Sequence, residues 1–190
     1  MHRLITSIAA LLLVFAGMAA RQPERGYRGF FDWSNSLRSD RIGFTGLDDS
    51  RTTLFYTGFD TSHGMQFNPW LYAGGGLEFL HCSKDDTNHF RPFAHVRTDL
   101  LFGKFSPFAS LRLGYNLTNG GGVYFSPEIG YRFNWGRKTG INIGAGLTLQ
   151  GYKIDVYDIS MLPEGYLSYE YTHSERRCRA YFSFRVGIDF

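Results

Sequence analysis

Apolar residues alternate with polar or small ones over the last eleven positions of the chain. The apolar positions are Ala180, Phe182, Phe184, Val186, Ile188 and Phe190. A period of two predicts a β-strand with one apolar face and one polar face. A strand of about this length, when tilted, crosses the hydrocarbon core of a bilayer. Taken alone, the pattern fits a membrane strand and the edge strand of a soluble sandwich equally well.

Similar segments recur from about Gly26 onward and predict seven further strands. Their ranges are 27–35, 54–67, 71–80, 92–102, 105–117, 123–135 and 141–153. The alternation is weakest in the second of them. With the C-terminal segment the total is eight, an even number and the smallest common size of a membrane β-barrel. The chain is therefore predicted to be all-β, an eight-stranded antiparallel up-and-down transmembrane β-barrel.

The connections between these segments differ in length. Short runs of turn-forming residues join every second pair of segments, at 68–69, 103–104 and 136–140. The other connections are mostly longer and cover 36–53, 81–91, 118–122 and 155–177. Short turns at one end and mostly longer loops at the other are typical of outer-membrane barrels. This pattern places both termini on the periplasmic side and argues against a soluble sandwich.

Composition agrees with a barrel. The chain contains 18 Phe, 12 Tyr and 3 Trp, or 17% aromatic residues, together with 23 Gly. The formal net charge of +3 is small and scattered, which argues against nucleic acid as a partner. A mean hydropathy of −0.23 leaves no helical membrane span in the body of the chain, whereas barrel strands need be apolar only at every second residue.

The N-terminus has the features of an export signal. A short basic start precedes a mostly apolar, uncharged stretch from Leu4 to Gly17. The small residues that follow fit a cleavage site after Ala19 or Ala20. We therefore expect residues 1–20 to be a signal peptide and residues 21–190 to form an outer-membrane barrel domain. The alternative is an uncleaved helical anchor.

The polar faces of the predicted strands carry charges of both signs. The residues concerned are Asp32, Glu78, His95, Arg97, Asp99, Arg112, Glu128, Arg132, Arg185 and Asp189. The lumen of an eight-stranded barrel is just wide enough to be filled by side chains. We interpret these residues as a salt-bridge network that plugs the lumen. The alternatives are a narrow ion path, a small-ligand site, or an acid–base site built around His95. The nearly balanced charge favours the plug, because an ion-selective pore would show an excess of one sign.

The apolar faces should contact lipid. Five aromatic residues on these faces lie near the predicted strand ends and are candidates for the aromatic girdles of a membrane barrel. They are Tyr27, Trp33, Tyr115, Tyr131 and Trp135.

Few other residues suggest chemistry. Cys82 and Cys178 are the only cysteines, and both fall at the end with the longer loops. In an exported chain they could form a disulfide or remain free, and two cysteines are too few for a zinc site. His173-Ser174-Glu175 contains residue types used in hydrolysis, but catalysis needs geometry rather than adjacency. We predict no catalytic, cofactor or metal site.

Several segments together resemble a known family. They are residues 26–30 (GYRGF), 63–71 (HGMQFNPWL), 106–108 (SPF) and the C-terminal 186–190 (VGIDF). The chain resembles the small eight-stranded outer-membrane barrels of the OmpA/OmpX-like group, in particular the outer-membrane β-barrel domain proteins common in Bacteroidota. The terminal Phe190 resembles the signal that the barrel assembly machinery reads. The resemblance therefore implies that machinery as a partner during biogenesis.

We expect from these observations a non-enzymatic protein of the bacterial outer membrane. Outer-membrane lipid would surround it, and its extracellular loops would give it a structural or adhesive role through contact with a host or another extracellular ligand. The alternatives are a narrow porin-like channel, a lipid-A-modifying enzyme, or a secreted lipocalin-like barrel. The separation of short turns from longer loops and the many inward charges count against the last.

Overall fold

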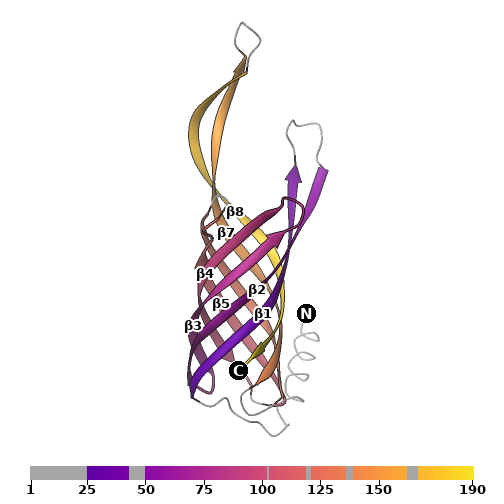
Figure 1. Ribbon diagram of the computed structural model, residues 1–190, viewed down its shortest axis with the longest axis vertical. Helices are drawn as coiled ribbons and strands as arrows, with labels where there is room; N and C mark the ends of the chain where they lie inside the picture. Colours follow the sequence, from indigo (N-terminus) through magenta and orange to yellow (C-terminus); the bar gives the residue numbers. More distant parts are fainter. Residues whose placement is uncertain (1–24, 43–49, 102, 119–120, 136–138, 162–166) are drawn as a thin grey trace, which may run out of the picture.

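The computed structural model describes residues 25–42, 50–101, 103–118, 121–135, 139–161 and 167–190. The signal peptide predicted for residues 1–20 lies outside them. The described chain forms eight antiparallel strands that close into one barrel in sequence order, with β1 beside β8 (Figure 1). The strands are β1 (Gly26–Ile42), β2 (Ser50–Asn68), β3 (Leu71–Cys82), β4 (Thr87–Asp99), β5 (Phe105–Tyr115), β6 (Val123–Asn134), β7 (Gly140–Met161) and β8 (Leu167–Asp189). The predicted all-β barrel and its strand number are confirmed.

Alternation along each strand separates the two surfaces of the barrel. In β6, for example, Tyr124, Ser126 and Glu128 are buried, whereas Phe125 and Ile129 between and after them are exposed. Successive side chains of a strand point to opposite faces. In a closed barrel one face is therefore the lumen and the other the outer wall. The protein thus has a largely polar interior and an apolar exterior, the reverse of a soluble barrel.

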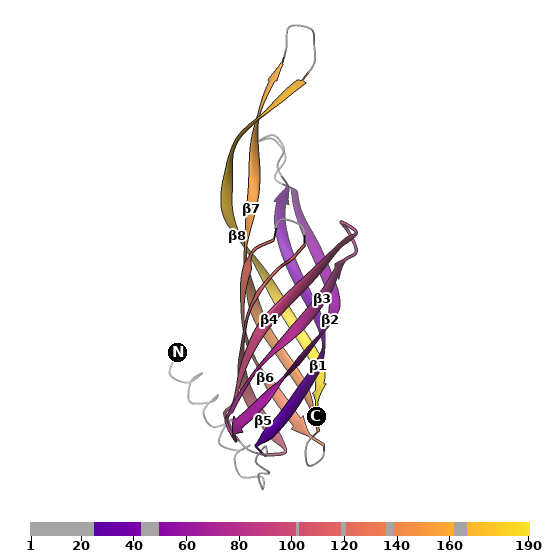
Figure 2. The ribbon, with the colours of Figure 1, turned by 60° about the vertical axis from the view of Figure 1, so that its left-hand side comes forward.

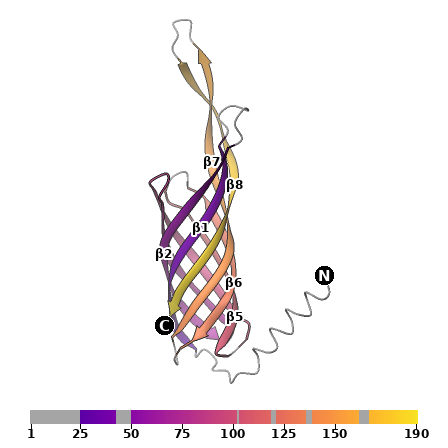
Figure 3. The same ribbon diagram turned by 90° about the vertical axis from the view of Figure 1, so that its right-hand side faces the viewer.

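The two ends of the barrel differ. The turns β2–β3, β4–β5 and β6–β7 lie at the same end as the C-terminus (Figures 1 and 3). The first of them is fixed by Asn68, whose side-chain oxygen accepts hydrogen bonds from the backbone N–H groups of Trp70 and Leu71, both at 2.9 Å. The three connections predicted to be short turns therefore lie together at one end of the barrel.

Several strands extend further than predicted. β1 continues to Ile42 rather than ending at residue 35, and β4 begins at Thr87 and ends at Asp99 rather than covering 92–102. The connection from β3 to β4 is accordingly a turn over residues 83–86 and not an eleven-residue loop. The prediction failed here because it followed apolar alternation, whereas a hydrogen-bonded ladder continues through polar residues as long as two strands stay paired.

The largest difference concerns β7 and β8. The segment 155–177, predicted to be a loop, is mostly strand, because β7 and β8 stay paired from Gly140–Asp189 up to Met161–Leu167. Their other neighbours end earlier: β6 pairs with β7 only as far as Gln150, and β1 pairs with β8 only as far as Phe182. The upper parts of β7 and β8 therefore leave the barrel as a two-stranded ribbon (Figures 1 and 2). We call residues 151–161 and 167–179 the arm.

The C-terminus closes the seam between β1 and β8. The backbone N–H of Phe190 donates to the carbonyl of Gly29 at 3.0 Å, and the N–H of Gly29 donates to the carbonyl of Phe190 at 2.8 Å. The Phe190 side chain faces outward and is 43% exposed. In the described part of the chain, no helix is long and apolar enough to cross a membrane.

Candidate functional site

All ten residues predicted to form the luminal network are buried inside the barrel. Three further charged residues belong to the same network: Arg28, Asp60 and Arg91. Sequence reasoning missed Asp60 because the alternation of the second segment is weak, and it assigned Arg91 to a loop. Arg28 has the same parity as Asp32 in the predicted strand 27–35, so the alternation by itself would have assigned it to the polar face.

One cluster fills the lumen near the short turns. Asp189 of β8 accepts two hydrogen bonds from Arg132 of β6, at 2.9 and 2.6 Å, and pairs with Arg28 of β1 at 3.1 Å. Asp99 of β4 pairs with Arg28 at 2.9 Å and with Arg97 at 3.0 Å. Four strands are thereby connected across the lumen by charge-assisted hydrogen bonds, which are stronger than neutral ones.

A second cluster lies further up the lumen. Arg112 of β5 donates to Asp32 of β1 at 2.7 Å and to Asp60 of β2 at 2.9 Å. Arg185 of β8 pairs with Glu128 of β6 at 2.6 Å, with Glu78 of β3 at 3.2 Å and with Asp60 at 3.5 Å. Arg91 of β4 adds a pair with Glu78 at 3.4 Å. These three arginines and their partners join seven of the eight strands, all but β7, through the barrel interior.

The two clusters together are balanced in charge. They contain six arginines, at 28, 91, 97, 112, 132 and 185, and six carboxylates, at 32, 60, 78, 99, 128 and 189. Every member pairs with at least one residue of opposite sign. Buried charges are tolerated only when they are paired, so the network is consistent with a filled lumen.

Aromatic rings pack around the charged clusters. Phe30, Tyr72 and His95 contact one another edge to face, with ring centroids 4.9 to 5.4 Å apart. The Arg97 guanidinium lies 3.7 Å from the centroid of the Phe108 ring. Rings in these positions fill space beside the charged groups and supply cation–π attraction.

The lumen changes character near the arm. Tyr56, Tyr181 and Cys82 are buried against one another, and Arg38 donates to the Tyr56 hydroxyl at 3.1 Å. Arg91 lies below them, 5.6 Å from the centroid of the Tyr181 ring. Two tyrosine rings, Cys82 and Arg38 therefore pack together at this end of the lumen.

Some buried polar atoms have no hydrogen-bond partner among the described residues. They include Asp60 Oδ1, the Tyr72 hydroxyl, His95 Nε2 and Arg112 Nε. The other ring nitrogen of His95 bonds to the Ser62 hydroxyl at 2.9 Å rather than to a carboxylate. The described contacts of His95 therefore do not form the acid–base pair that was an alternative at the sequence level.

The two cysteines are not joined. Cys82 is buried on β3, where its register partners are Tyr56 and Thr87, whereas Cys178 is an exposed residue of β8 paired with Gly151. Of the two alternatives that the sequence left open, this structure has the free thiols, with Cys82 inside the barrel and Cys178 exposed on β8.

The residues His173, Ser174 and Glu175 do not form a nucleophile–base pair in their described contacts. His173 Nε2 lies 3.3 Å from Glu175 Oε1, while the Ser174 hydroxyl bonds to Tyr171 at 3.0 Å. Hydrogen bonds from Arg177, and secondarily from His173, lower the pKa of the exposed Glu175 carboxyl below its ordinary value. Across the described side chains, no group of three or more His, Cys, Asp or Glu residues could hold a metal ion.

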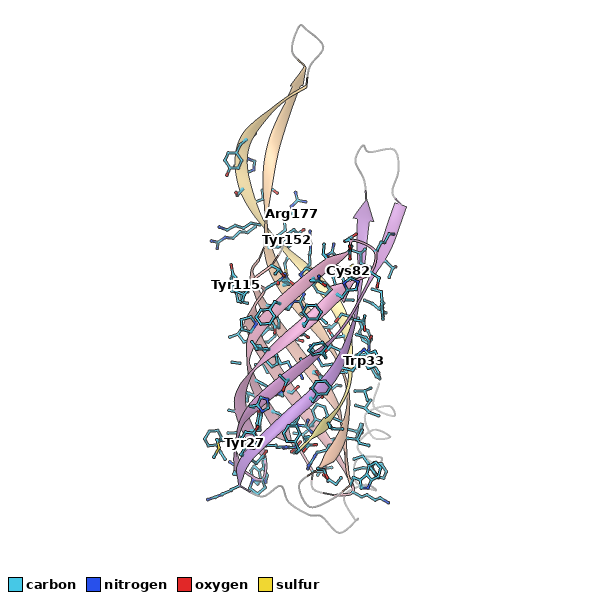
Figure 4. The ribbon with its side chains drawn as sticks, viewed as in Figure 1. Tyr27, Trp33, Cys82, Tyr115, Tyr152 and Arg177 are labelled. Atoms are coloured by element: carbon cyan, nitrogen blue, oxygen red, sulfur yellow. The ribbon has the colours of Figure 1, made fainter. Side chains whose placement is uncertain are left out.

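The outer wall is apolar and rich in aromatic residues. Tyr27, Tyr115, Tyr131 and Trp135, four of the predicted girdle residues, are exposed on it. Trp33, the fifth, is also exposed, but it lies at mid-height of the barrel because β1 continues to Ile42 (Figure 4). The prediction that Trp33 belongs to a girdle at a strand end is therefore wrong.

Side chains on this wall line an apolar groove of about 430 Å³ between β5, β6, β7 and β8. Its lining includes Pro107, Ile129, Ile143 and Phe184. A continuous apolar exterior of this kind is what hydrocarbon, rather than water, would cover.

Comparison with solved structures finds the same architecture in other proteins. The crystal structure of Neisserial surface protein A (NspA) matches with a TM-score of 0.56 and 12% sequence identity, over 86% of this chain and 97% of that one. The crystal structure of the outer membrane protein OprG from Pseudomonas aeruginosa matches with a TM-score of 0.52 and 10% identity, over 90% of this chain and 98% of that one. No protein-family model matches the chain, and no curated protein matches its sequence. At these identities the likeness shows the fold alone, that of a small eight-stranded antiparallel β-barrel.

Proposed function

We propose that this chain is a non-enzymatic barrel of the bacterial outer membrane whose lumen is closed and whose arm makes the functional contacts. Its outer wall is apolar and its interior polar, which suits a barrel immersed in lipid. One of the similar structures is that of a surface protein and the other that of an outer membrane protein. Export by residues 1–20 and insertion by the barrel assembly machinery, with Phe190 as its signal, belong to the same proposal.

The observation that carries the proposal is the balanced network in the lumen. Six arginines and six carboxylates connect all eight strands except β7 by ion pairs, and Asn142 of β7 donates to Asp189 at 3.1 Å. An ion entering this interior would have to separate buried ion pairs, and the separated side chains would have no water to solvate their charges. We therefore expect the barrel not to conduct ions.

The arm is the part of the protein best placed for contact with other molecules. It extends beyond the rest of the barrel at the end opposite the short turns (Figures 1 and 3). Its strands leave the ladder with β1 and β6, so each has one edge whose backbone N–H and C=O groups face no strand of the barrel. Exposed strand edges are templates for pairing with another chain. An adhesive role, with a host or a neighbouring cell as the partner, fits this feature best.

A narrow channel is the second candidate. The buried polar atoms without protein partners, such as Asp60 Oδ1 and Arg112 Nε, could line a thin thread of water. An ion path would follow only if the paired arginines moved aside.

The test begins with the mature chain refolded in detergent. We expect a folded band that shifts on boiling in a denaturing gel, and silence when the same preparation enters a planar bilayer. The variant Arg185→Ser removes the cation that pairs with Asp60, Glu78 and Glu128, so we expect it to open a cation-selective conductance. Arg177→Ser on the arm is the matched control and should stay silent.

Each other outcome contradicts a definite part of the proposal. Steady conductance of the unaltered barrel would support the channel. A chain that stays folded and soluble without detergent would overturn the membrane assignment.

A further inference from the structure

Two cations face each other where the arm leaves the barrel. Lys153 of β7 and Arg176 of β8 are direct register partners, and both side chains are exposed. Side chains directly opposite in an antiparallel pair have Cβ atoms about 5 Å apart, and like charges in such a pair are destabilising. Nothing in the ladder requires two cations here.

The pair lies at the top of the apolar outer face. The rungs below it on the same face are Gly151–Cys178, Leu149–Ala180 and Leu147–Phe182, which continue down the exposed wall of the barrel. Tyr152 and Arg177 adjoin the two cations in the chain, and both lie just above the rim of the barrel (Figure 4). Tyr115 lies near the same rim. In a membrane barrel this is the level at which hydrocarbon gives way to lipid headgroups.

The neighbouring cations of the arm are already engaged. Arg177 donates two hydrogen bonds to Glu175, at 3.1 and 2.9 Å, and the Arg179 guanidinium lies 3.5 Å from the centroid of the Tyr152 ring. Neither Lys153 nor Arg176 forms an ion pair with any side chain that the structure describes. These two cations are therefore available to an anion from outside the chain.

We propose that Lys153 and Arg176 clamp a phosphate group of a phosphorylated glycolipid in the outer leaflet of the membrane. The inference rests on the proposed membrane location. Arg binds phosphate oxygens in a bidentate fork and Lys adds a point charge, and one phosphate between the two side chains turns their repulsion into attraction. The apolar rungs below would lie beside the acyl chains of the same lipid. The site would thus anchor the base of the arm at the membrane surface.

The experiment measures lipid binding by the full mature barrel in detergent at low ionic strength. The probes are bisphosphorylated lipid A, the same lipid A with both phosphates removed, and inorganic phosphate. We expect preference for the phosphorylated lipid. Each cation near an anionic surface strengthens binding about fivefold, so Lys153→Gln with Arg176→Gln should weaken that binding roughly 25-fold. Binding of the dephosphorylated lipid should not change.

The control variant, Lys84→Gln with Arg25→Gln, removes two other exposed positive charges and should bind like the parent. Equal loss in the control, or saturation of the pair by inorganic phosphate, would overturn the inference. Migration of the folded band on gels separates the two proposals. A folded barrel without preference for phosphate refutes the clamp alone, and a chain that does not fold in detergent refutes the membrane assignment as well.

Discussion

The lower and upper parts of β7 and β8 are one continuous ladder in two different settings. Below Gln150 and Phe182, each strand has a neighbour on both sides, one face in the lumen and the other on the apolar wall. Above them the same two strands pair only with each other. A two-stranded ribbon has marginal stability by itself in water. Closure of the barrel, rather than the β7–β8 pairing, therefore holds the lower part together.

The charges of the two parts differ in the same way. In the barrel, Arg185 is buried and pairs with three carboxylates. In the arm, Arg177 is exposed and pairs with Glu175 alone. Burial makes a missing partner costly, whereas exposure lets water replace it. Substitutions in the lumen should consequently affect stability, and substitutions in the arm should affect binding.

Removal of Arg112 should have the largest effect on stability. Arg112→Leu leaves Asp32 and Asp60 buried without their shared cation. Breaking a buried pair in this way costs about 3–5 kcal/mol. We expect a lower urea midpoint for the loss of the heat-modifiable band.

The variant Arg112→Met with Asp32→Asn and Asp60→Asn is the informative control. Because it removes the charges together, it should recover much of the lost stability. A single variant Arg112→Leu as stable as the parent would show that water, and not the arginine, neutralises the two carboxylates.

Two glycines of the same ladder test the packing on either side of the boundary. A Cβ added at Gly187 would meet the Asp32 carboxylate and the backbone carbonyl of Phe31, whereas at Gly151 the nearest atom is the carbonyl oxygen of Val123, 3.7 Å away. Gly187→Ala should therefore destabilise the barrel by about 1–3 kcal/mol, as overpacking does. Gly151→Ala should leave the urea midpoint unchanged or slightly raise it. Equal effects at both sites would mean that packing does not change where the arm begins.

Shortening the arm should cost the barrel little. Replacement of residues 155–174 by Asn-Gly joins Ile154 to Glu175 through a two-residue hairpin turn. The ladder partners of the deleted residues that the structure describes lie within the arm, so we expect the free energy of unfolding of the barrel to change by less than about 0.5 kcal/mol. Attachment of cells or of an extracellular ligand should be lost. A barrel that no longer folds without these residues would show that the arm guides assembly.

The barrel was predictable because its exterior must be apolar at every second residue. Residues such as Phe182, Phe184 and Val186 carry that requirement in the sequence, and the intervening Arg185 marks the lumen. The luminal residues were found for the same reason. Asp60 was missed because Thr57, Thr61 and His63 interrupt the apolar outward row of the second segment. Arg91 was missed because the connection predicted for residues 81–91 contained it.

The arm was not predictable from the same signal. Outside hydrocarbon neither face of a ribbon has to be apolar, so its residues, for example 172–177 (THSERR), show no alternation. What makes them a strand is the continuing ladder from the barrel below. The sequence also could not predict which charges pair across the lumen, for example Arg132 with Asp189. Those pairs depend on the tilt and register of the whole barrel.

The smallest expected effect is the titration of Glu175. Its pKa lies below the ordinary value of 4.5 because Arg177 and His173 hydrogen-bond to its charged form. A depressed carboxyl pKa stabilises the arm above pH 4.5, and that contribution disappears as the pH falls through the lowered pKa. Since the pair is exposed to solvent, water and salt screen it, and Glu175→Gln should leave the urea midpoint unchanged at neutral pH. Carbon NMR of the Glu175 carboxyl in the detergent-folded barrel should report the lowered midpoint in the parent and its return towards 4.5 in Arg177→Gln. If the titration midpoint of Glu175 does not move in Arg177→Gln, Arg177 does not set the pKa of Glu175. The contrast between Arg177, which is paired, and Lys153 and Arg176, which are available to an outside anion, would then lose its support.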